Sequence, residues 1–500
     1  MSGVQEHPNH QAPRNHRDHR NHPVHRAGSA EGATAPRRAA PGRLAGAARR
    51  IEAATPPDRS RAVDAVRALA ICGVVLGHWC VTALVPAHAG ADGAAGPLTV
   101  ASPLQHLTEL APVSWGLQTL ALFFFAGGWA NAASLRAGVR HRPWIASRLR
   151  RLAGPAAGPT ALWAVLLGTL LATGVLDGAT AGTVARLVTA PLWFLAVYAL
   201  LTAATPVALA AVRRWGAPAA VPPAALVALG DWASFGPGSE ALDAAAPAVV
   251  AVLGWLQVPA GWLVPFLLGV AVREGRLGTG PGRRGAGVAL LVGGAAGMAL
   301  LVARAGYPAS AVGVTGADRS NLAPPSLFAV ALGCAQVGLA LLAWRRLERV
   351  SRRPLVWAPV AGLNLLAMPV FLWHQSALLL TTLGLHLAIR GSRLLDAAAA
   401  GTDPGAEAGT WAATAPGAGT APWAEAAGWL LSGLLGHPDS PGWVAARLLW
   451  LPVLLAVLAG TLAAFRRGGG GGHRKTLCPC RRGTPTVVAA KKGGGPTSVH

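Results

Sequence analysis

Apolar residues along this chain form ten blocks, each about as long as the ~20 residues that an α-helix needs to cross ~30 Å of hydrocarbon. The blocks cover residues 65–86, 114–135, 155–175, 191–212, 217–234, 248–272, 286–305, 323–344, 356–380 and 442–464. The weakest is 217–234, which is interrupted by Pro222 and Pro223 and ends in Asp231. The pattern predicts an all-α integral membrane protein with about ten transmembrane helices.

The polar stretches between these blocks differ in charge. Arginines lie in residues 136–151, 213–216, 273–285 and 345–354 and in the C-terminal tail, whereas residues 87–113 and 235–247 contain no Lys or Arg. Because cations favour cytoplasmic loops, this strict alternation predicts that both termini are cytoplasmic. We therefore attribute the net charge of +23 to loops and tails that set the orientation of a protein in the cell membrane. We expect the lipid bilayer as a partner and no nucleic acid, since no folded basic module is visible.

Composition agrees with this assignment and divides the chain into three parts. Hydrophobic residues make up 52% and charged residues 13%, against about 25% charged in a soluble protein. Residues 1–60 are rich in His, Arg, Pro and Ala and predict a disordered cytoplasmic tail, and residues 466–500 predict a second one. Residues 61–465 form the predicted membrane domain, with a long external loop at 389–440 that is either flexible or holds a short amphipathic piece around 423–435.

The first apolar block carries polar residues on one face. At 100° per residue, Arg67 and His78 differ by about 20° in azimuth, and Asp64 lies within about 60° of Arg67. Ionisable groups inside membrane helices are costly and usually functional. A neutral imidazole suits proton abstraction from a hydroxyl, so His78 is a candidate general base. The alternatives are a packed histidine at position 78 and an interfacial anchor pair formed by Arg67 and Asp64.

These residues also carry a resemblance to a known family. The Arg67-x10-His78 spacing is similar to a first-helix pattern of the acyltransferase 3 family, and Arg148-Leu-Arg-Arg151 is similar to its Arg-x-x-Arg motif between helices 2 and 3. Further stretches that resemble its actinobacterial-type members are Phe123–Asn131, Pro191–Phe194, Ser320–Pro325 and Phe371–Gln375. The resemblance extends from about Arg61 to Phe465.

The resemblance implies transfer of an acyl group, often acetyl, from acyl-coenzyme A to a hydroxyl, commonly on a sugar. His78 and Arg67 would be catalytic. Arg148 and Arg151 would contact the phosphates of acyl-CoA, which agrees with the preference of arginine for phosphate, although both also fit a positive-inside anchor. The donor is a substrate, so no permanently bound cofactor and no metal are expected.

Three further residues are candidates for substrate binding: His374, Trp193 and Asp64. His374 lies in an apolar run between Trp373 and Gln375, and either binds the acceptor or packs between helices. Trp193 and Asn131 have the same two interpretations, and Asn131 would hydrogen-bond between helices.

Two other functions fit parts of the pattern. A transporter of a polar metabolite or glycolipid also has many helices, intramembrane polar groups and a broken helix. A sensor or scaffold would bind anionic lipid through its basic tails. Some members of the resembled family end in a secreted hydrolase-like domain, whereas this chain ends soon after its last apolar block. We therefore expect it either to acylate its acceptor directly or to pass the group to an extracytoplasmic transferase partner.

Overall fold

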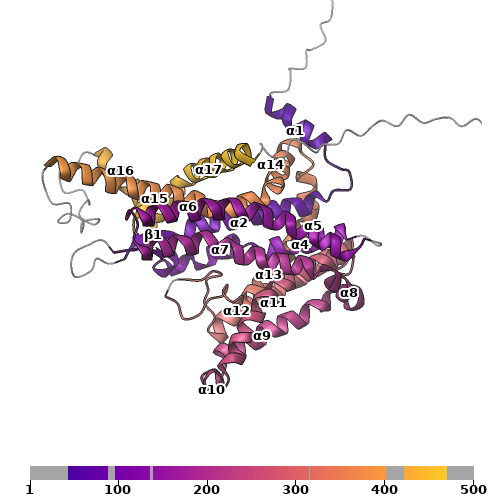
Figure 1. The fold of residues 1–500 in the computed structure, drawn as a ribbon. Coiled ribbons are helices and arrows are strands. Elements are labelled where there is room, and N and C mark those ends of the chain that lie inside the picture. The colour runs from indigo at the N-terminus through magenta and orange to yellow at the C-terminus, as the bar shows by residue number, and fades with distance from the viewer. Residues whose placement is uncertain (1–42, 88–95, 136–138, 315, 401–421, 470–500) are drawn as a thin grey trace, which may run out of the picture.

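A computed structural model describes residues 43–87, 96–135, 139–314, 316–400 and 422–469 (Figure 1). This part of the chain is 80% helical, with one antiparallel pair of short strands, β1 (Ala83–Pro86) and β2 (Leu98–Ala101). The α-helices are α1 (Arg43–Ala53), α2 (Arg61–Val81), α3 (Ser114–Leu117), α4 (Leu120–Ser134), α5 (His141–Ala153), α6 (Ala157–Ala172), α7 (Gly178–Ala203), α8 (Thr205–Trp215), α9 (Val221–Phe235), α10 (Ser239–Ala245), α11 (Pro247–Arg273), α12 (Pro281–Ala305), α13 (Leu327–Val350), α14 (Pro354–Leu365), α15 (Ala367–Ala400), α16 (Pro422–Leu435) and α17 (Pro441–Gly469). The all-α membrane class predicted from the sequence is confirmed.

Nine segments of the described chain are long and apolar enough to cross a membrane. They are Arg61–Val81, Thr108–Ser134, His141–Ala172, Gly178–Ala203, Pro247–Arg273, Pro281–Ala305, Leu327–Val350, Ala367–Ser392 and Pro441–Arg466. In Ala367–Ser392, 67% of the most apolar stretch is buried, against 11% in His141–Ala172 and in Pro441–Arg466. The helices α2 and α15 therefore belong to the interior of the bundle, and α6 and α17 to its periphery.

The described helices do not confirm the ten crossings that the sequence predicts. Nine of the ten predicted blocks correspond to these nine segments, and the remaining block, 217–234, forms the 15-residue helix α9 after a short 3₁₀ turn. The predicted block 356–380 is also divided, because α14 and α15 are separate helices. A count of ten is not confirmed, and the cytoplasmic placement of both termini stays a prediction.

Part of the predicted N-terminal tail is folded. The sequence predicts disorder up to residue 60, but α1 forms at Arg43–Ala53 and packs against α14 (Figure 1). Arg61 forms an ion pair with Glu52, and Trp357 Nε1 donates a hydrogen bond to Thr55 Oγ1 (2.7 Å). The ion pair joins α1 to the first residue of α2, and the hydrogen bond from Trp357 joins the segment after α1 to α14; composition encodes neither contact. Residues 1–42 and 470–500 lie outside the described part of the chain.

The helices α4 and α11 cross where glycines leave no side chain between them. A Cβ atom at Gly128 would lie 2.1 Å from the backbone oxygen of Phe266, and one at Gly269 would lie 2.0 Å from that of Phe125. The contact is reciprocal, since each glycine faces the backbone of the other helix. Small residues of this kind allow membrane helices to approach closely.

Close helix contacts form at a glycine pair of α2 and at Asn131. Gly73 and Gly77 are four residues apart, a spacing that allows another segment to approach closely. A Cβ atom at Gly73 would clash with Thr119, and one at Gly77 would touch Leu117, so the segment before α4 packs closely on α2. Asn131 of α4 is 2% exposed and donates from Nδ2 to Thr202 Oγ1 of α7 (3.2 Å). Asn131 therefore bonds between helices.

A buried acidic residue ties α9 to the start of α13. Asp231 accepts hydrogen bonds from Gln257 Nε2 (2.6 Å), Tyr307 Oη (2.7 Å) and the backbone nitrogen of Leu327 (2.8 Å). Arg319 lies 4.0 Å from the same carboxylate. Burial, followed by the hydrogen bond to Asp231, raises the pKa of Tyr307, so its phenol stays protonated and donates. Because the carboxylate also faces the N-terminus of α13, the helix dipole stabilises its charge.

Candidate active site

The structure brings His78 of α2 next to two consecutive residues of α15. Gln375 Nε2 lies 3.1 Å from His78 Nδ1, and the rings of His78 and His374 have centroids 5.1 Å apart. Trp79 Nε1 donates to the backbone oxygen of His374 (2.9 Å) and holds the two helices in this register. The sequence identified His78 and His374 separately, and the fold places them together.

His374 has a defined tautomer. Its ring is fully buried, and Nδ1 lies 2.6 Å from the backbone oxygen of Phe371. A carbonyl only accepts, so the ring proton is on Nδ1 and Nε2 carries a lone pair. No described residue forms a hydrogen bond with this Nε2. In the neutral ring, Nε2 of His374 can therefore accept a proton, and this ring lies beside that of His78.

The amide of Gln375 selects the tautomer of His78. With Nε2 of the amide toward Nδ1, the amide donates and the proton of a neutral His78 is on its Nε2. With the amide turned by 180°, Oε1 accepts from Nδ1–H and the lone pair of His78 is on Nε2. The orientation of the Gln375 amide thus determines which ring nitrogen of His78 carries the proton and which carries the lone pair. Gln375 entered the sequence analysis only as part of a motif, because its partner lies almost 300 residues away.

Three arginines gather near the other end of α2. Arg148 of α5 lies within direct electrostatic range of Arg67, Arg151 and Tyr198. Arg67 and Arg148 are half-buried, and Arg151 is exposed. Three guanidinium groups repel one another, so their grouping favours an anionic ligand such as a phosphate. The fold brings together Arg67 and the predicted Arg148–Arg151 motif, which are on different helices.

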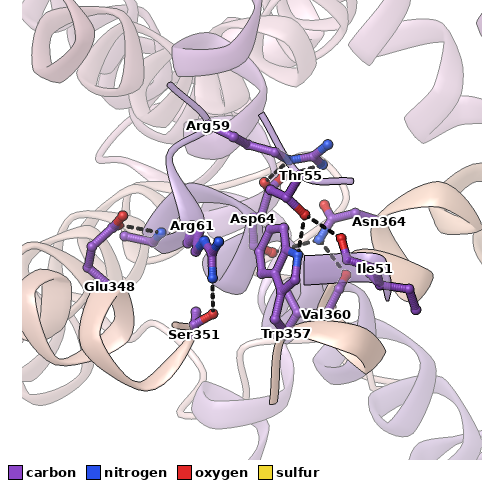
Figure 2. A network of polar contacts seen from close by, with 11 residues as sticks. Ile51, Thr55, Arg59, Arg61, Asp64, Glu348, Ser351, Trp357, Val360 and Asn364 are labelled. Carbon is purple, nitrogen blue, oxygen red and sulfur yellow. Dashed lines mark hydrogen bonds and ion pairs between the residues drawn. The ribbon is translucent and has the colours of Figure 1, made fainter. Parts of the chain in front are cut away.

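Asp64 lies close to this end of α2, but its carboxylate is engaged elsewhere. It forms an ion pair with Arg59 through both oxygens, and Asn364 Nδ2 donates to its backbone oxygen (2.8 Å) (Figure 2). Arg61 of the same turn donates to the backbone oxygen of Ser351 (3.0 Å). The carboxylate of Asp64 is thus occupied by Arg59, and the contact with α14 at this position is made by the backbone oxygen. Substrate binding by Asp64 stays a prediction, and in this structure Arg67 is not its partner.

An aromatic cluster surrounds the histidine pair on the α7 side. Phe194 contacts Phe371 with ring centroids 4.5 Å apart, and Phe371 contacts His374 at 5.7 Å. Trp193 is 39% exposed and touches the outer side of this cluster through Phe194. Its predicted contact with substrate remains a prediction.

Tyr198 is the member of this cluster that sequence reasoning missed. Its ring packs against Phe123 and Phe194, and it lies within electrostatic range of Arg148. A Cβ atom at Gly127 would lie 2.6 Å from the Tyr198 ring, so this glycine makes room for it. The signal available in the sequence was Gly127 within Phe123–Asn131, one of the stretches that carried the resemblance.

Comparison with known proteins identifies the family. A family model described as an acyltransferase domain, that of the acyltransferase 3 family, matches residues 60–464. No curated protein and no solved structure matches the chain. The match covers the helix that carries Arg67 and His78, the Arg148–Arg151 motif, eight of the nine membrane segments in full and the ninth as far as residue 464. It favours an enzyme over the transporter and scaffold alternatives. The chain therefore belongs to the acyltransferase 3 family and is a multi-pass membrane acyltransferase.

Proposed function

We propose that this acyltransferase moves an acyl group, in the simplest case acetyl, from acyl-coenzyme A to a hydroxyl of a carbohydrate or glycosylated acceptor at the cell membrane. The observation that carries this proposal is the arrangement along α2. Arg67 lies with Arg148 and Arg151 near one end of the helix, and His78 meets His374 and Gln375 eleven residues further on. These two positions are about 16 Å apart along the helix axis.

Each end of this arrangement suits one part of the reaction. The arginines would hold the phosphates of the donor, and the long pantetheine arm would extend along α2 toward His78. His78 would remove the proton of the acceptor hydroxyl as its oxygen attacks the thioester carbonyl. The new C–O bond forms, the C–S bond breaks, and the thiolate of coenzyme A leaves and takes up a proton. The buried aromatic cluster excludes water and so limits hydrolysis of the thioester.

The direct test uses vesicles that contain the purified protein, labelled acetyl-coenzyme A and an extract of envelope glycans. We expect label to move to a glycan as an ester that mild base releases, and mass spectrometry of the product then identifies the acceptor. Longer acyl donors, tested in parallel, establish the acyl length. Absence of transfer from every acyl-CoA tested, with the protein folded, would contradict the proposed donor.

Replacing Arg148 or Arg151 by alanine should raise KM for the donor by about tenfold or more, since a hydrogen bond to a charged group contributes about 1.5–3 kcal/mol. The turnover number should change less, because these arginines are remote from His78. The measurement is the initial rate as a function of acyl-CoA concentration. Arg150→Ala is the matched control, since Arg150 is an exposed arginine of the same helix. An equal rise of KM in all three variants would indicate a general effect of positive charge and contradict a specific phosphate site.

A further inference from the structure

A buried arginine lies near the start of α17, in a segment apolar enough to cross the membrane. Arg447 is 1% exposed and is among the largest fully buried side chains of the described residues. A cation at this position is costly, so buried arginines of membrane helices usually serve a function. Arg447 lies outside the motifs of α2, α5 and α15, and it has no part in the acyl-transfer step proposed above.

Arg447 has an unusual set of contacts. Its Nη2 donates to the backbone oxygen of Thr82 (2.6 Å), and its guanidinium lies 4.8 Å from the ring centre of Trp443. In the described part of the chain, no carboxylate forms an ion pair with Arg447, and its Nε and Nη1 have no hydrogen-bond partner. The charge of Arg447 is therefore directed at the backbone of Thr82.

Thr82 is the C-terminal cap of α2 and directly follows its last residue, Val81. Its backbone nitrogen donates to the backbone oxygen of His78 (3.0 Å), which closes the last turn of the helix. The terminal carbonyls of a helix lack intrahelical partners and form its negative pole. A guanidinium at this pole both satisfies a carbonyl and supplies the opposite charge. Arg447 thus acts on the turn of α2 that carries His78.

Close contacts hold α17, which carries Arg447, against α16. A Cβ atom at Gly433 of α16 would lie 2.7 Å from the backbone nitrogen of Arg447, so α16 and α17 are in close backbone contact. Trp450 Nε1 donates to the backbone oxygen of Leu430 (2.8 Å), and Trp443 Nε1 donates to that of Gly436 (3.1 Å). Three contacts along the pair fix α17 against α16. Arg447 is consequently held by the α16–α17 pair, which is separate from α2.

We propose that Arg447 is a positioning residue that anchors the C-terminal turn of α2, and through it the imidazole of His78, relative to Gln375 and the substrate. This inference rests on the proposed role of His78 in acyl transfer. It explains why a buried guanidinium is directed at a helix end instead of a carboxylate. It also gives the α16–α17 pair, which contributes no predicted catalytic residue, a part in the reaction.

The first test compares Arg447→Met with Arg447→Lys. Methionine removes the charge and the hydrogen bond at similar length, and we expect kcat to fall roughly ten- to hundredfold, because small displacements of a catalytic group have effects of this size. KM for acyl-CoA should change less than about twofold, since the arginines that would bind the donor are at the other end of α2. Lysine keeps a cationic donor and should restore most of kcat. Arg304→Met, at an exposed arginine near the end of α12, is the control and should leave both constants unchanged.

The second test measures the accessibility of the last turn of α2 and does not depend on activity. Cys80 lies between His78 and Thr82, is partly buried, and is within electrostatic range of Arg447. If Arg447→Met loosens this turn, labelling of Cys80 by a membrane-permeant maleimide should accelerate several-fold, measured by peptide mass spectrometry. Labelling of Cys334, a partly buried cysteine of α13, should not change and reports on the fold as a whole.

The outcomes separate the two proposals. Faster labelling of Cys80 alone, with reduced kcat and recovery in the lysine variant, supports the anchor. Unchanged labelling of Cys80, unchanged kcat, or equal acceleration at Cys334 would overturn it, the last because the effect would be general unfolding. If His78→Ala keeps its activity, acyl transfer stands but the proposed role of His78 fails, and the inference that rests on that role fails as well, even if Cys80 labelling shows that Arg447 orders the turn.

Discussion

Replacing His78 by alanine should lower the rate of acyl transfer by roughly 10²- to 10⁴-fold, the range in which a positioned general base contributes. The reason is that no other described side chain combines a half-buried imidazole with a position on the same helix as Arg67. The measurement is the initial rate of label transfer from saturating acetyl-coenzyme A, at matched amounts of folded protein.

His106→Ala is the control for this experiment. His106 is exposed and lies outside α2, so its loss should not change the rate. A second comparison, His374→Gln, separates the two histidines, since His374 is fully buried and bonded to its own helix. Transfer by His78→Ala at a rate close to that of the native protein would exclude His78 as the base.

The substitution Gly269→Ala should destabilise the fold by about 1–3 kcal/mol or more, the usual cost of overpacking a filled interior. The new Cβ atom would lie 2.0 Å from the backbone oxygen of Phe125, and a backbone atom cannot move aside as a flexible side chain can. The helices α4 and α11 would have to separate, which also disturbs Gly128 against Phe266. Thermal unfolding in detergent measures the effect as a lowered Tm.

Gly254→Ala provides a control on the same helix. Gly254 also belongs to α11, but a Cβ atom there has no atom within 4 Å. This variant should be neutral or slightly more stable, because alanine favours the helix over glycine by up to about 1 kcal/mol. Equal destabilisation by both substitutions would show that helix propensity, and not the α4–α11 contact, determines the result.

The candidate site combines residues of α2 with residues of two helices that pack against it. Arg67 and His78 are on one rigid helix, so their separation is fixed, whereas Arg148, His374 and Gln375 reach them from α5 and α15. The geometry of the site is therefore set by how two helices dock on α2. The hydrogen bond from Trp79 to the backbone oxygen of His374 is one of the bonds that establish this docking.

The sequence by itself determined the membrane class, nine of the helical segments and the face of α2 that carries Arg67 and His78. These features are local. A helix in a bilayer must satisfy its own backbone hydrogen bonds, so a run of apolar residues of sufficient length already specifies it. The azimuth of two residues on one helix follows from the helical repeat alone. The glycines Gly73 and Gly77 were likewise readable from their spacing as a place of close approach.

Only the tertiary structure decided which helices meet. It placed His374 and Gln375 beside His78, Arg148 near Arg67, Arg59 on Asp64 and Arg447 on the end of α2. It also ordered α1. Lipid surrounds apolar helices without preference, so pairing depends on the fit of side chains and on a few polar bonds between residues far apart in the chain. Those contacts have no periodicity for a sequence to display.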